Sequence, residues 1–268
     1  MAAADHDVEL RSAQARGDGF ETVLVSLSSA LGVETLRADE ASELLDAWHE
    51  GALALPPPFG VWASAGLQEI DPDALARTLD QGAVGLVLPA RALSDGSGLA
   101  HVAPLLDLLE QRQAPLFVHP GVALPPPAGA PEWWAPLVDY VGQMHAAWYA
   151  LRAHGRQRHP RLRVVFALLA GLAPLHGERF AARAGARTVV DPLAFLETSS
   201  YGARAIDAVV RVVGIDVIVA GTDRPYTIPP GCGLDGAALH AVRDVNPVRL
   251  LQPKEVSDAL FVAAGAES

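Results

Sequence analysis

Two polar side chains follow apolar, strand-like runs of this sequence, and their types fit catalysis. His119 comes directly after Leu116–Val118, and Asp223 comes shortly after Val217–Ala220. An imidazole and a carboxylate can bind a divalent metal ion together, and the carboxylate can also accept a proton from a metal-bound water. In the competing structural interpretation, His119 caps a turn and Asp223 orders its own loop. The catalytic interpretation predicts His119 and Asp223 as catalytic residues and as metal ligands.

The elements around these two residues alternate between short β-rich runs and longer stretches with helical spacing. This alternation is typical of a parallel sheet that is covered by helices. The clearest helical stripe is formed by Ala205, Ile206, Val209, Val210 and Val213. Seven runs are predicted strands: Thr22–Leu27, Phe59–Ala63, Val84–Leu88, Leu116–Val118, Val164–Ala167, Phe195–Thr198 and Val217–Ala220.

Seven strands in regular alternation with helices favour a distorted α/β barrel of the (β/α)8, TIM-like type. An open nucleotide-binding sheet is disfavoured because no glycine-rich fingerprint follows the first strand. The helical stretch Val8–Ala15 leaves no room for a convincing earlier strand, so the first strand of the barrel is predicted to be missing or vestigial. No Gly/Ser-rich linker divides the chain, and residues 1–268 are predicted to form a single domain. In such a barrel the catalytic groups lie at the carboxyl ends of the strands.

The composition argues against several classes of function. A formal net charge of −11 disfavours binding to nucleic acid, which needs a basic surface. Cys232 is the only cysteine, so an internal disulfide and a cysteine-based zinc cluster are excluded. No apolar run reaches the roughly 18 residues of a membrane span, and no secretory leader is visible. We therefore expect a cytoplasmic protein that binds neither nucleic acid nor membrane.

Five short elements follow one another in the order seen in a known family. They are Phe117–Pro120, Arg163–Ala167, Glu197–Ser200, Gly221–Pro225 and Asn246–Leu251. Over roughly residues 20 to 252 the chain resembles the amidohydrolase-related branch of the metal-dependent hydrolases. That branch includes aminocarboxymuconate semialdehyde decarboxylase and other nonoxidative aromatic-acid decarboxylases. The resemblance implies a distorted barrel with one divalent metal ion, most often zinc, in which His119 matches a metal-binding histidine and Asp223 matches the aspartate after the last strand.

The chain departs from the family pattern at its metal ligands. The family opens with a His-x-His pair on its first strand, and this sequence has no equivalent pair. A further family histidine falls at Leu168, whose side chain cannot bind a metal. Two matched ligands are fewer than the three protein ligands usual in a catalytic zinc site. His176 is a candidate for a third ligand, although an ordinary helix-start residue is the competing interpretation, and a site without metal stays open.

Four further residues are predicted to bind the substrate. Trp133 and Trp134 lie in the loop after His119, where the resemblance implies an aromatic side chain over the substrate. Arg224 and Tyr226 flank Asp223 and could bind a carboxylate or a phenol. Arg224 could equally pair with Asp223 and lower the pKa of that carboxyl.

These residues predict an amidohydrolase-family enzyme, a metal-assisted hydrolase or a nonoxidative decarboxylase of a small carboxylated or aromatic substrate. In the decarboxylase, Asp223 would exchange a proton with the ring carbon. The alternative is a degenerate barrel without metal that acts as a binding, regulatory or assembly subunit. A barrel without its first strand exposes unpaired strand edges that a second copy could cover, so we also expect a homo-oligomer.

Overall fold

The fold is an α/β structure built on parallel strands. The computed structural model describes residues 6–185, 189–227 and 231–251. In these ranges seven strands form one sheet, and each strand pairs in parallel with its neighbour in the chain. The strands are β1 (Val23–Val25), β2 (Phe59–Ala63), β3 (Gly85–Pro89), β4 (Leu116–His119), β5 (Val164–Phe166), β6 (Ala194–Glu197) and β7 (Ile218–Val219). All seven predicted strands are confirmed, with bounds that agree to within two residues.

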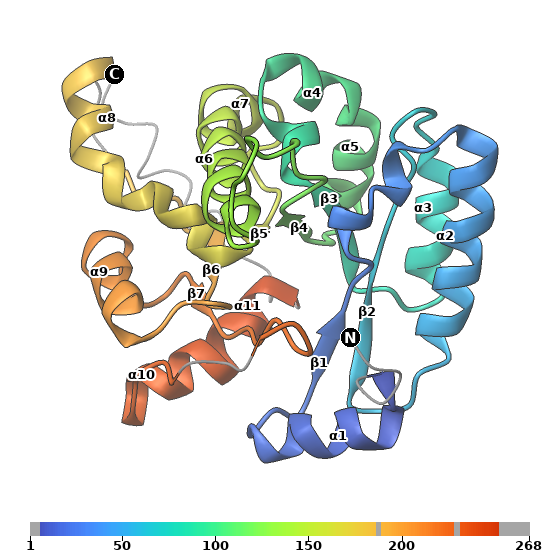
Figure 1. The fold of residues 1–268 in the computed structure, drawn as a ribbon, viewed down its shortest axis with the longest axis horizontal. Coiled ribbons are helices and arrows are strands. Elements are labelled where there is room, and N and C mark those ends of the chain that lie inside the picture. The colour runs from blue at the N-terminus through green and yellow to red at the C-terminus, as the bar shows by residue number, and fades with distance from the viewer. Residues whose placement is uncertain (1–5, 186–188, 228–230, 252–268) are drawn as a thin grey trace.

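Helices surround the curled sheet and cover its outer face (Figure 1). They are α1 (Val8–Gly17), α2 (Ala38–Leu53), α3 (Pro72–Asp80), α4 (Gly96–His101), α5 (Ala103–Gln111), α6 (Tyr140–Ala150), α7 (Arg156–Arg158), α8 (Gly177–Ala184), α9 (Ala203–Val213), α10 (Gly236–His240) and α11 (Asn246–Leu251). Carboxylates cap several of their N-termini, as Asp7, Asp71 and Asp95 each accept a backbone N–H from the first turn. No helix within the described ranges is long and apolar enough to cross a membrane.

The sheet is a TIM-like half-barrel of seven strands in the described ranges, and the predicted TIM-like fold is confirmed. Within the described residues α1 precedes β1, so β1 and β7 are the two edges of the sheet. The gap between these edges is bridged by side chains. Arg224, after β7, binds Asp18, after α1, through two hydrogen bonds of 2.6 and 3.0 Å. The guanidinium of Arg243 also lies over the ring of Phe20, 4.9 Å from its centroid. These contacts tie the N-terminal helix to the segment after β7.

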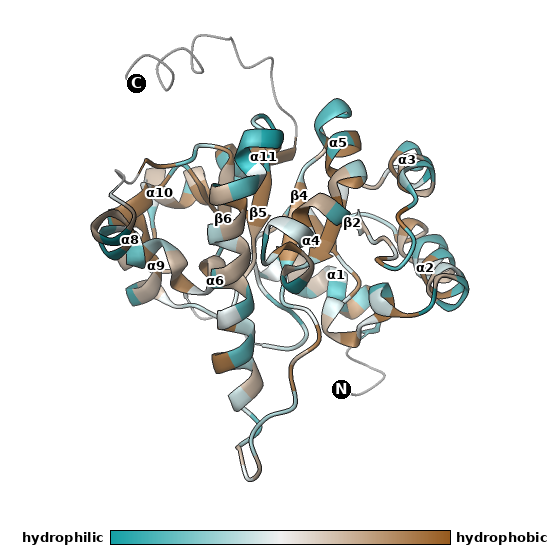
Figure 2. Cartoon of the chain, turned by 90° about the horizontal axis from the view of Figure 1, so that it is seen from above, coloured by the Kyte–Doolittle hydropathy of each residue, from teal (hydrophilic) through white to brown (hydrophobic). Residues whose placement is uncertain are grey.

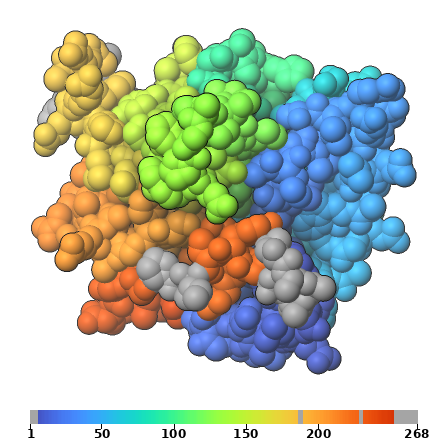
Figure 3. All heavy atoms as spheres, in the orientation of Figure 1, coloured from blue at the N-terminus to red at the C-terminus, as the bar shows by residue number. Residues whose placement is uncertain are grey.

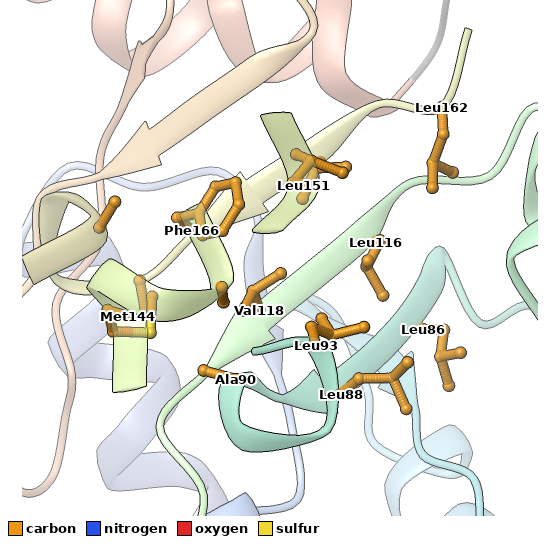
Figure 4. Packing of buried hydrophobic residues seen from close by; sticks show 14 of the residues in the cluster. Leu86, Leu88, Ala90, Leu93, Leu116, Val118, Met144, Leu151, Leu162 and Phe166 are labelled. Carbon is orange, nitrogen blue, oxygen red and sulfur yellow. The ribbon is translucent and has the colours of Figure 1, made fainter. Parts of the chain in front are cut away.

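Buried apolar side chains fill both faces of the strands, because successive residues of a strand point to opposite faces. On the outer face, Leu86, Leu88, Leu116, Val118 and Phe166 pack against helical residues such as Met144 and Leu151 (Figure 4). The inner face holds a smaller cluster to which every strand contributes one side chain. Its strand members are Leu24, Trp62, Val87, Phe117, Val165, Phe195 and Val219. This inner cluster is the floor on which the candidate site lies.

Candidate functional site

The inner face continues beyond its apolar floor toward the carboxyl ends of the strands. His119, Glu197 and Gly221 lie two positions after Phe117, Phe195 and Val219, so they point to the same inner face. We call the region formed by His119, Glu197, Gly221 and Asp223 the mouth. In Figure 3 the segments that follow β1 (blue), β4 (green) and β7 (orange) meet at the middle of this side of the molecule.

Glu197, the last residue of β6, is the most tightly held side chain of the mouth. The backbone N–H of Ser199 donates to its Oε1 at 2.7 Å, and the Ser199 hydroxyl hydrogen-bonds its Oε2. Burial, and then the charge of Asp223, raise the pKa of Glu197 from 4.5 to about 7, although the two hydrogen bonds from Ser199 and, to a smaller extent, the backbone N–H of Leu168 oppose that rise.

Gly221 has no side chain, and the Glu197 carboxyl group occupies the space that a side chain at position 221 would fill. A Cβ atom at position 221 would lie 1.2 Å from Oε1 of Glu197, which is far inside contact distance. The backbone N–H of Gly221 donates to the hydroxyl of Thr198 at 3.2 Å, which fixes the start of the loop after β7 against the end of β6. The side-chain carboxyl group of Glu197 and the backbone of Gly221 are therefore in direct contact.

Asp223 lies in the loop after β7 as a second carboxyl of the mouth. Its Oδ2 accepts a hydrogen bond of 3.3 Å from the hydroxyl of Ser200. Burial raises the pKa of Asp223, and the hydrogen bond from Ser200 acts in the opposite direction. The pKa of Tyr140, at the start of α6, is raised by burial and then by the charges of Asp139 and Asp223.

His119, the last residue of β4, is a neutral imidazole at neutral pH. Burial lowers its pKa, and the hydrogen bond to the backbone carbonyl of Pro120 only partly opposes that effect. The bond joins Nδ1 to the Pro120 oxygen at 3.0 Å. Because a carbonyl can only accept, Nδ1 carries the proton and Nε2 keeps its lone pair. His119 can therefore accept a proton or a hydrogen bond through Nε2.

Backbone strain is concentrated beside the mouth. Seven non-glycine residues of the described ranges have positive φ, and six of them follow β5, β6 or β7. They include Ser200 and Asp223, which are hydrogen-bonded to each other, and a continuous left-handed run from Leu168 to Leu172. Non-glycine residues in this conformation cost free energy and persist where the surrounding structure holds them, often at functional sites.

The described residues do not form a metal site at the mouth. No group of three or more histidine, cysteine, aspartate or glutamate side chains within these ranges is arranged to hold a metal ion. The position of the further family histidine is occupied by Leu168, which supplies a backbone N–H and no ligand. His119 and Asp223 alone fall short of the three ligands of a catalytic zinc site. The mouth offers acid and base groups instead.

The predicted third ligand, His176, lies elsewhere in the described structure. It is exposed at the start of α8, and its ring packs against that of His145 on α6, with ring centroids 5.2 Å apart. His145 in turn contacts the Gly171 carbonyl through Nε2 at 2.6 Å. His176 therefore has a packing role between α6 and α8, and its role as a metal ligand stays a prediction.

The predicted aromatic residues lie on an arm that projects from the body between β4 and α6 (Figure 2). Trp133 is 56% exposed and stacks on Trp134 with ring centroids 6.2 Å apart. Trp134 lines a cavity of about 460 Å³ beside α6, whose polar floor includes Arg91 and Asp139. Gln143, which also lines the cavity, accepts the backbone N–H of Gly121, two residues after His119, at 2.8 Å.

The two residues beside Asp223 differ in their surroundings. Arg224 pairs with Asp18, and its own backbone carbonyl accepts a bond of 3.0 Å from Arg11. The alternative in which Arg224 pairs with Asp223 is not what the structure shows, because Asp18 takes both hydrogen bonds of the guanidinium. Tyr226 is 57% exposed, and its backbone N–H donates to the carbonyl of Asp223 at 2.9 Å.

Comparison with known proteins identifies solved structures of the same fold. No protein-family model and no curated protein matches the chain by sequence. A 2,6-dihydroxybenzoate decarboxylase from Rhizobium matches 92% of this chain and 88% of its own at 19% identity, with a TM-score of 0.70. The chain has the same fold. A solved amidohydrolase II matches 91% and 88% of the two chains at 18% identity, with a TM-score of 0.76.

A third solved structure of this fold contains a metal ion. It is a mutant of 5-carboxyvanillate decarboxylase from Novosphingobium aromaticivorans with bound manganese and 3-methoxy-4-hydroxy-5-nitrobenzoic acid. It matches 91% of this chain and 81% of its own at 18% identity, with a TM-score of 0.75. These comparisons confirm the predicted TIM-like fold and agree with the resemblance to the decarboxylases and amidohydrolases.

The sequence pattern assigns no role to one residue of the mouth, Glu197, which lies within a predicted strand. Glu197 nevertheless follows an apolar run, Ala194–Leu196, just as His119 follows Leu116–Val118. A charged or titratable residue at the end of a buried parallel strand was the signal that identified His119. The same signal applies to Glu197.

Proposed function

We propose that the chain is an enzyme of the amidohydrolase type that acts on a small carboxylated or aromatic molecule, with nonoxidative decarboxylation as the favoured reaction. The likeness of its fold to aromatic-acid decarboxylases supports this proposal. The observation that carries it is the pair of carboxyl groups at the ends of β6 and β7, both with raised pKa. Perturbed carboxyls that meet at the carboxyl ends of barrel strands are typical of catalytic centres.

Decarboxylation of an aromatic acid replaces the bond to the carboxylate with a bond to hydrogen. The reaction needs a proton for the ring carbon and a group that accepts or donates hydrogen bonds to a ring substituent. The carboxyl groups of Glu197 and Asp223 supply the proton transfer, and Nε2 of His119 accepts a hydrogen bond from a phenol or orients it. Trp133, Trp134 and Tyr226 are the proposed contacts to the ring, whereas Arg224 is held by Asp18.

Turnover of hydroxybenzoates by the purified chain tests the proposal. A panel of mono- and dihydroxybenzoates is incubated with the protein, and release of carbon dioxide is measured. We expect turnover of at least one compound and a loss of about 10²- to 10⁴-fold in Asp223→Asn, because that variant cannot exchange a proton. An Asp223→Asn variant with undiminished turnover would remove Asp223 from the chemistry.

A second function is favoured by the incomplete metal-ligand set. A barrel that keeps only His119 and Asp223 of the family ligands fits a binding or regulatory subunit, in which the mouth holds an aromatic acid without converting it. Calorimetric titration with the same hydroxybenzoates separates the two functions. Binding without turnover supports the subunit, and turnover supports the enzyme.

We also propose that the chain forms a homo-oligomer. The edge strands β1 and β7 are short, with three and two residues, and the sheet leaves them unpaired on their outer sides. Unpaired edges are ready sites for association with a second copy. Sedimentation over a wide range of protein concentration tests this proposal, and a monomer at every concentration would contradict it.

A further inference from the structure

The cavity of about 460 Å³ beside α6 contains none of the residues that form the mouth. We propose that this cavity binds a small aromatic carboxylate, with its ring against Trp134 and its carboxylate at Arg91. The inference rests on the proposed function for the class of the ligand, and it gives that ligand a binding site outside the mouth. The volume lies within the range of roughly 300 to 1,000 Å³ that is usual for small-molecule sites.

Part of the cavity lining is apolar and exposed. Leu124 and Val138 are 58% and 46% exposed, although both are large apolar side chains. The apolar lining consists of Leu124, Pro125, Pro126, Trp134 and Val138. Exposed apolar side chains that gather around one cavity are typical of a site for an apolar or aromatic group. The ring of an aromatic ligand would cover these side chains and remove their surface from water, which favours binding.

The polar part of the lining is held by one hydrogen-bond network around Asp139. The Asp139 carboxylate accepts hydrogen bonds of 3.0 and 3.2 Å from Nη2 of Arg91 and one of 2.6 Å from Nε2 of Gln143. The backbone N–H of Leu124 also donates to it, at 3.2 Å. Gln143 is only 5% exposed, and its Nε2 donates to the Val122 carbonyl at 3.3 Å as well. The network joins the turn after β3, the arm and α6, so the cavity is formed before a ligand enters.

Arg91 keeps two of its nitrogen groups for a ligand. All of its hydrogen bonds within the described ranges come from Nη2, which donates to Asp139 and to the Val122 carbonyl. Nε and Nη1 therefore have no partner among the described residues. The side chain lines the cavity and is 42% exposed. Both oxygens of Asp139, in contrast, already accept hydrogen bonds. Because a guanidinium pairs well with a carboxylate, the cavity fits an aromatic acid better than a neutral or cationic ring.

Gly142 allows the cavity to be filled without a change in this network. Gly142 lines the cavity from α6, and a Cβ atom there would have no other atom within 4 Å. We expect Gly142→Leu to weaken the binding of benzoate at least 10-fold, because the leucine takes the space of the ring. The thermal midpoint is not expected to fall, since a helix gains from the loss of an interior glycine. Gly51→Leu is the matched control on α2, where a Cβ atom also has no neighbour within 4 Å, and it is expected to bind benzoate like the wild type.

Calorimetric titration with benzoate and with benzamide tests the part of Arg91. The two probes share the ring, and only benzoate carries a charge. We expect Arg91→Gln to weaken benzoate about 10- to 100-fold, because a hydrogen-bonded partner of the charge is lost, and to change benzamide little. Arg37→Gln, which breaks an exposed ion pair with Asp39, is the matched control and keeps the wild-type affinity for both probes. Equal losses for the two probes in Arg91→Gln, or no loss for either, would overturn the role of Arg91.

Three results would overturn the site itself. They are no binding of benzoate to the wild type, undiminished binding in Gly142→Leu, and a change in sedimentation in Gly142→Leu without a change in benzoate binding. The last result would mean that a second copy of the chain covers the cavity.

The site and the proposed reaction fail separately. Turnover of a hydroxybenzoate together with undiminished benzoate binding in Gly142→Leu would remove the site and keep the proposed function. Benzoate binding that is lost in Gly142→Leu, in a chain that turns over no hydroxybenzoate, would keep the site and remove the proposed reaction.

Discussion

Two glutamates of this half-barrel, Glu34 and Glu197, each accept a hydrogen bond from a serine hydroxyl, and only Glu197 is also affected by the charge of a second carboxyl group. Glu34 is fully buried after β1, where the Ser29 hydroxyl donates to its Oε1 at 2.6 Å and its Oε2 has no partner among the described groups. Glu197 also has a serine partner, but it has a second carboxyl beside it and lies on the inner face of a strand end. Burial and a serine partner are common to both glutamates, whereas the charge of Asp223 and the position at a strand end belong to Glu197 alone of the two.

The difference between the two glutamates follows from their elements. Glu34 lies in a short turn, Val33–Thr35, whose backbone is tied to the segment after β2 by a hydrogen bond of 2.7 Å from Leu67 to the Glu34 carbonyl. The contact with Ser29 therefore stabilises a loop. Glu197 instead follows a buried strand of the central sheet, so its position is set by the most rigid part of the fold.

The largest expected effect comes from Gly221→Ala, which removes the room for Glu197. The new Cβ would lie 1.2 Å from Oε1, so the carboxyl must move away from its donors. We expect turnover to fall by more than 100-fold and the free energy of unfolding to fall by about 1 to 3 kcal/mol. Gly51→Ala is the control, because nothing lies near that helical glycine and alanine there adds about 0.5 to 1 kcal/mol of stability. Equal behaviour of the two variants would show that the packing of Gly221 on Glu197 has no consequence.

The next effect is the pH dependence of stability at Glu197. Its pKa is raised from 4.5 in the unfolded chain to about 7 in the folded one, so the folded state favours the protonated form. The corresponding stability is complete below pH 4.5 and is lost as the pH rises through 7, by about 3 kcal/mol in total. Urea unfolding from pH 4.5 to 8 is expected to show this loss in the wild type relative to Glu197→Gln. Parallel curves for the two proteins would contradict the raised pKa.

The comparison of the two glutamates is sharpened by removing each serine hydroxyl. Ser29→Ala leaves a buried Glu34 carboxyl without its donor, so we expect a loss of about 1 to 3 kcal/mol in stability with unchanged turnover. Ser199→Ala leaves the backbone N–H of residue 199 as a donor to Glu197 and is expected to change the pH profile of turnover more than stability. Chemical unfolding and pH-rate profiles of both variants provide the measurement. A loss of turnover in Ser29→Ala would mean that the two sites are coupled.

The smallest effect is expected at the ion pair that links α1 to the segment after β7. A double-mutant cycle of Asp18→Asn and Arg224→Gln is expected to give a coupling energy of about 1 kcal/mol, because both side chains are partly exposed. The free energy of unfolding is the measured quantity. A coupling energy near zero would show that this pair does not hold the two edges of the half-barrel together.

Most of the fold could be predicted from the sequence because the pattern of a parallel sheet is local. Runs such as Phe59–Ala63 and Val164–Ala167 are short, apolar and separated by helical stretches, so their bounds follow from hydropathy alone. The same pattern identified His119 and Asp223 as polar residues after strands. The structure places His119 at the end of β4 and Asp223 in the loop after β7, and their catalytic roles stay predictions.

The other features of the site could not be predicted from the sequence, because they depend on backbone conformation and on which side chains the fold brings together. The left-handed conformation of Leu168, Leu169, Ala170 and Leu172 occurs in residues that ordinarily avoid it, so the residue types do not predict it. His176 was placed by its separation from Leu168, but its ring packs against that of His145.

A nuclear magnetic resonance titration of the chain with ¹³C-labelled glutamate side chains tests the central claim most directly. The signal of Glu197, identified by its absence in Glu197→Gln, is followed from pH 4 to 9 in the wild type and in Asp223→Asn. The account predicts a midpoint of about 7 in the wild type and a lower midpoint when the charge of Asp223 is removed. A midpoint in the ordinary glutamate range, with no response to Asp223→Asn, would contradict it.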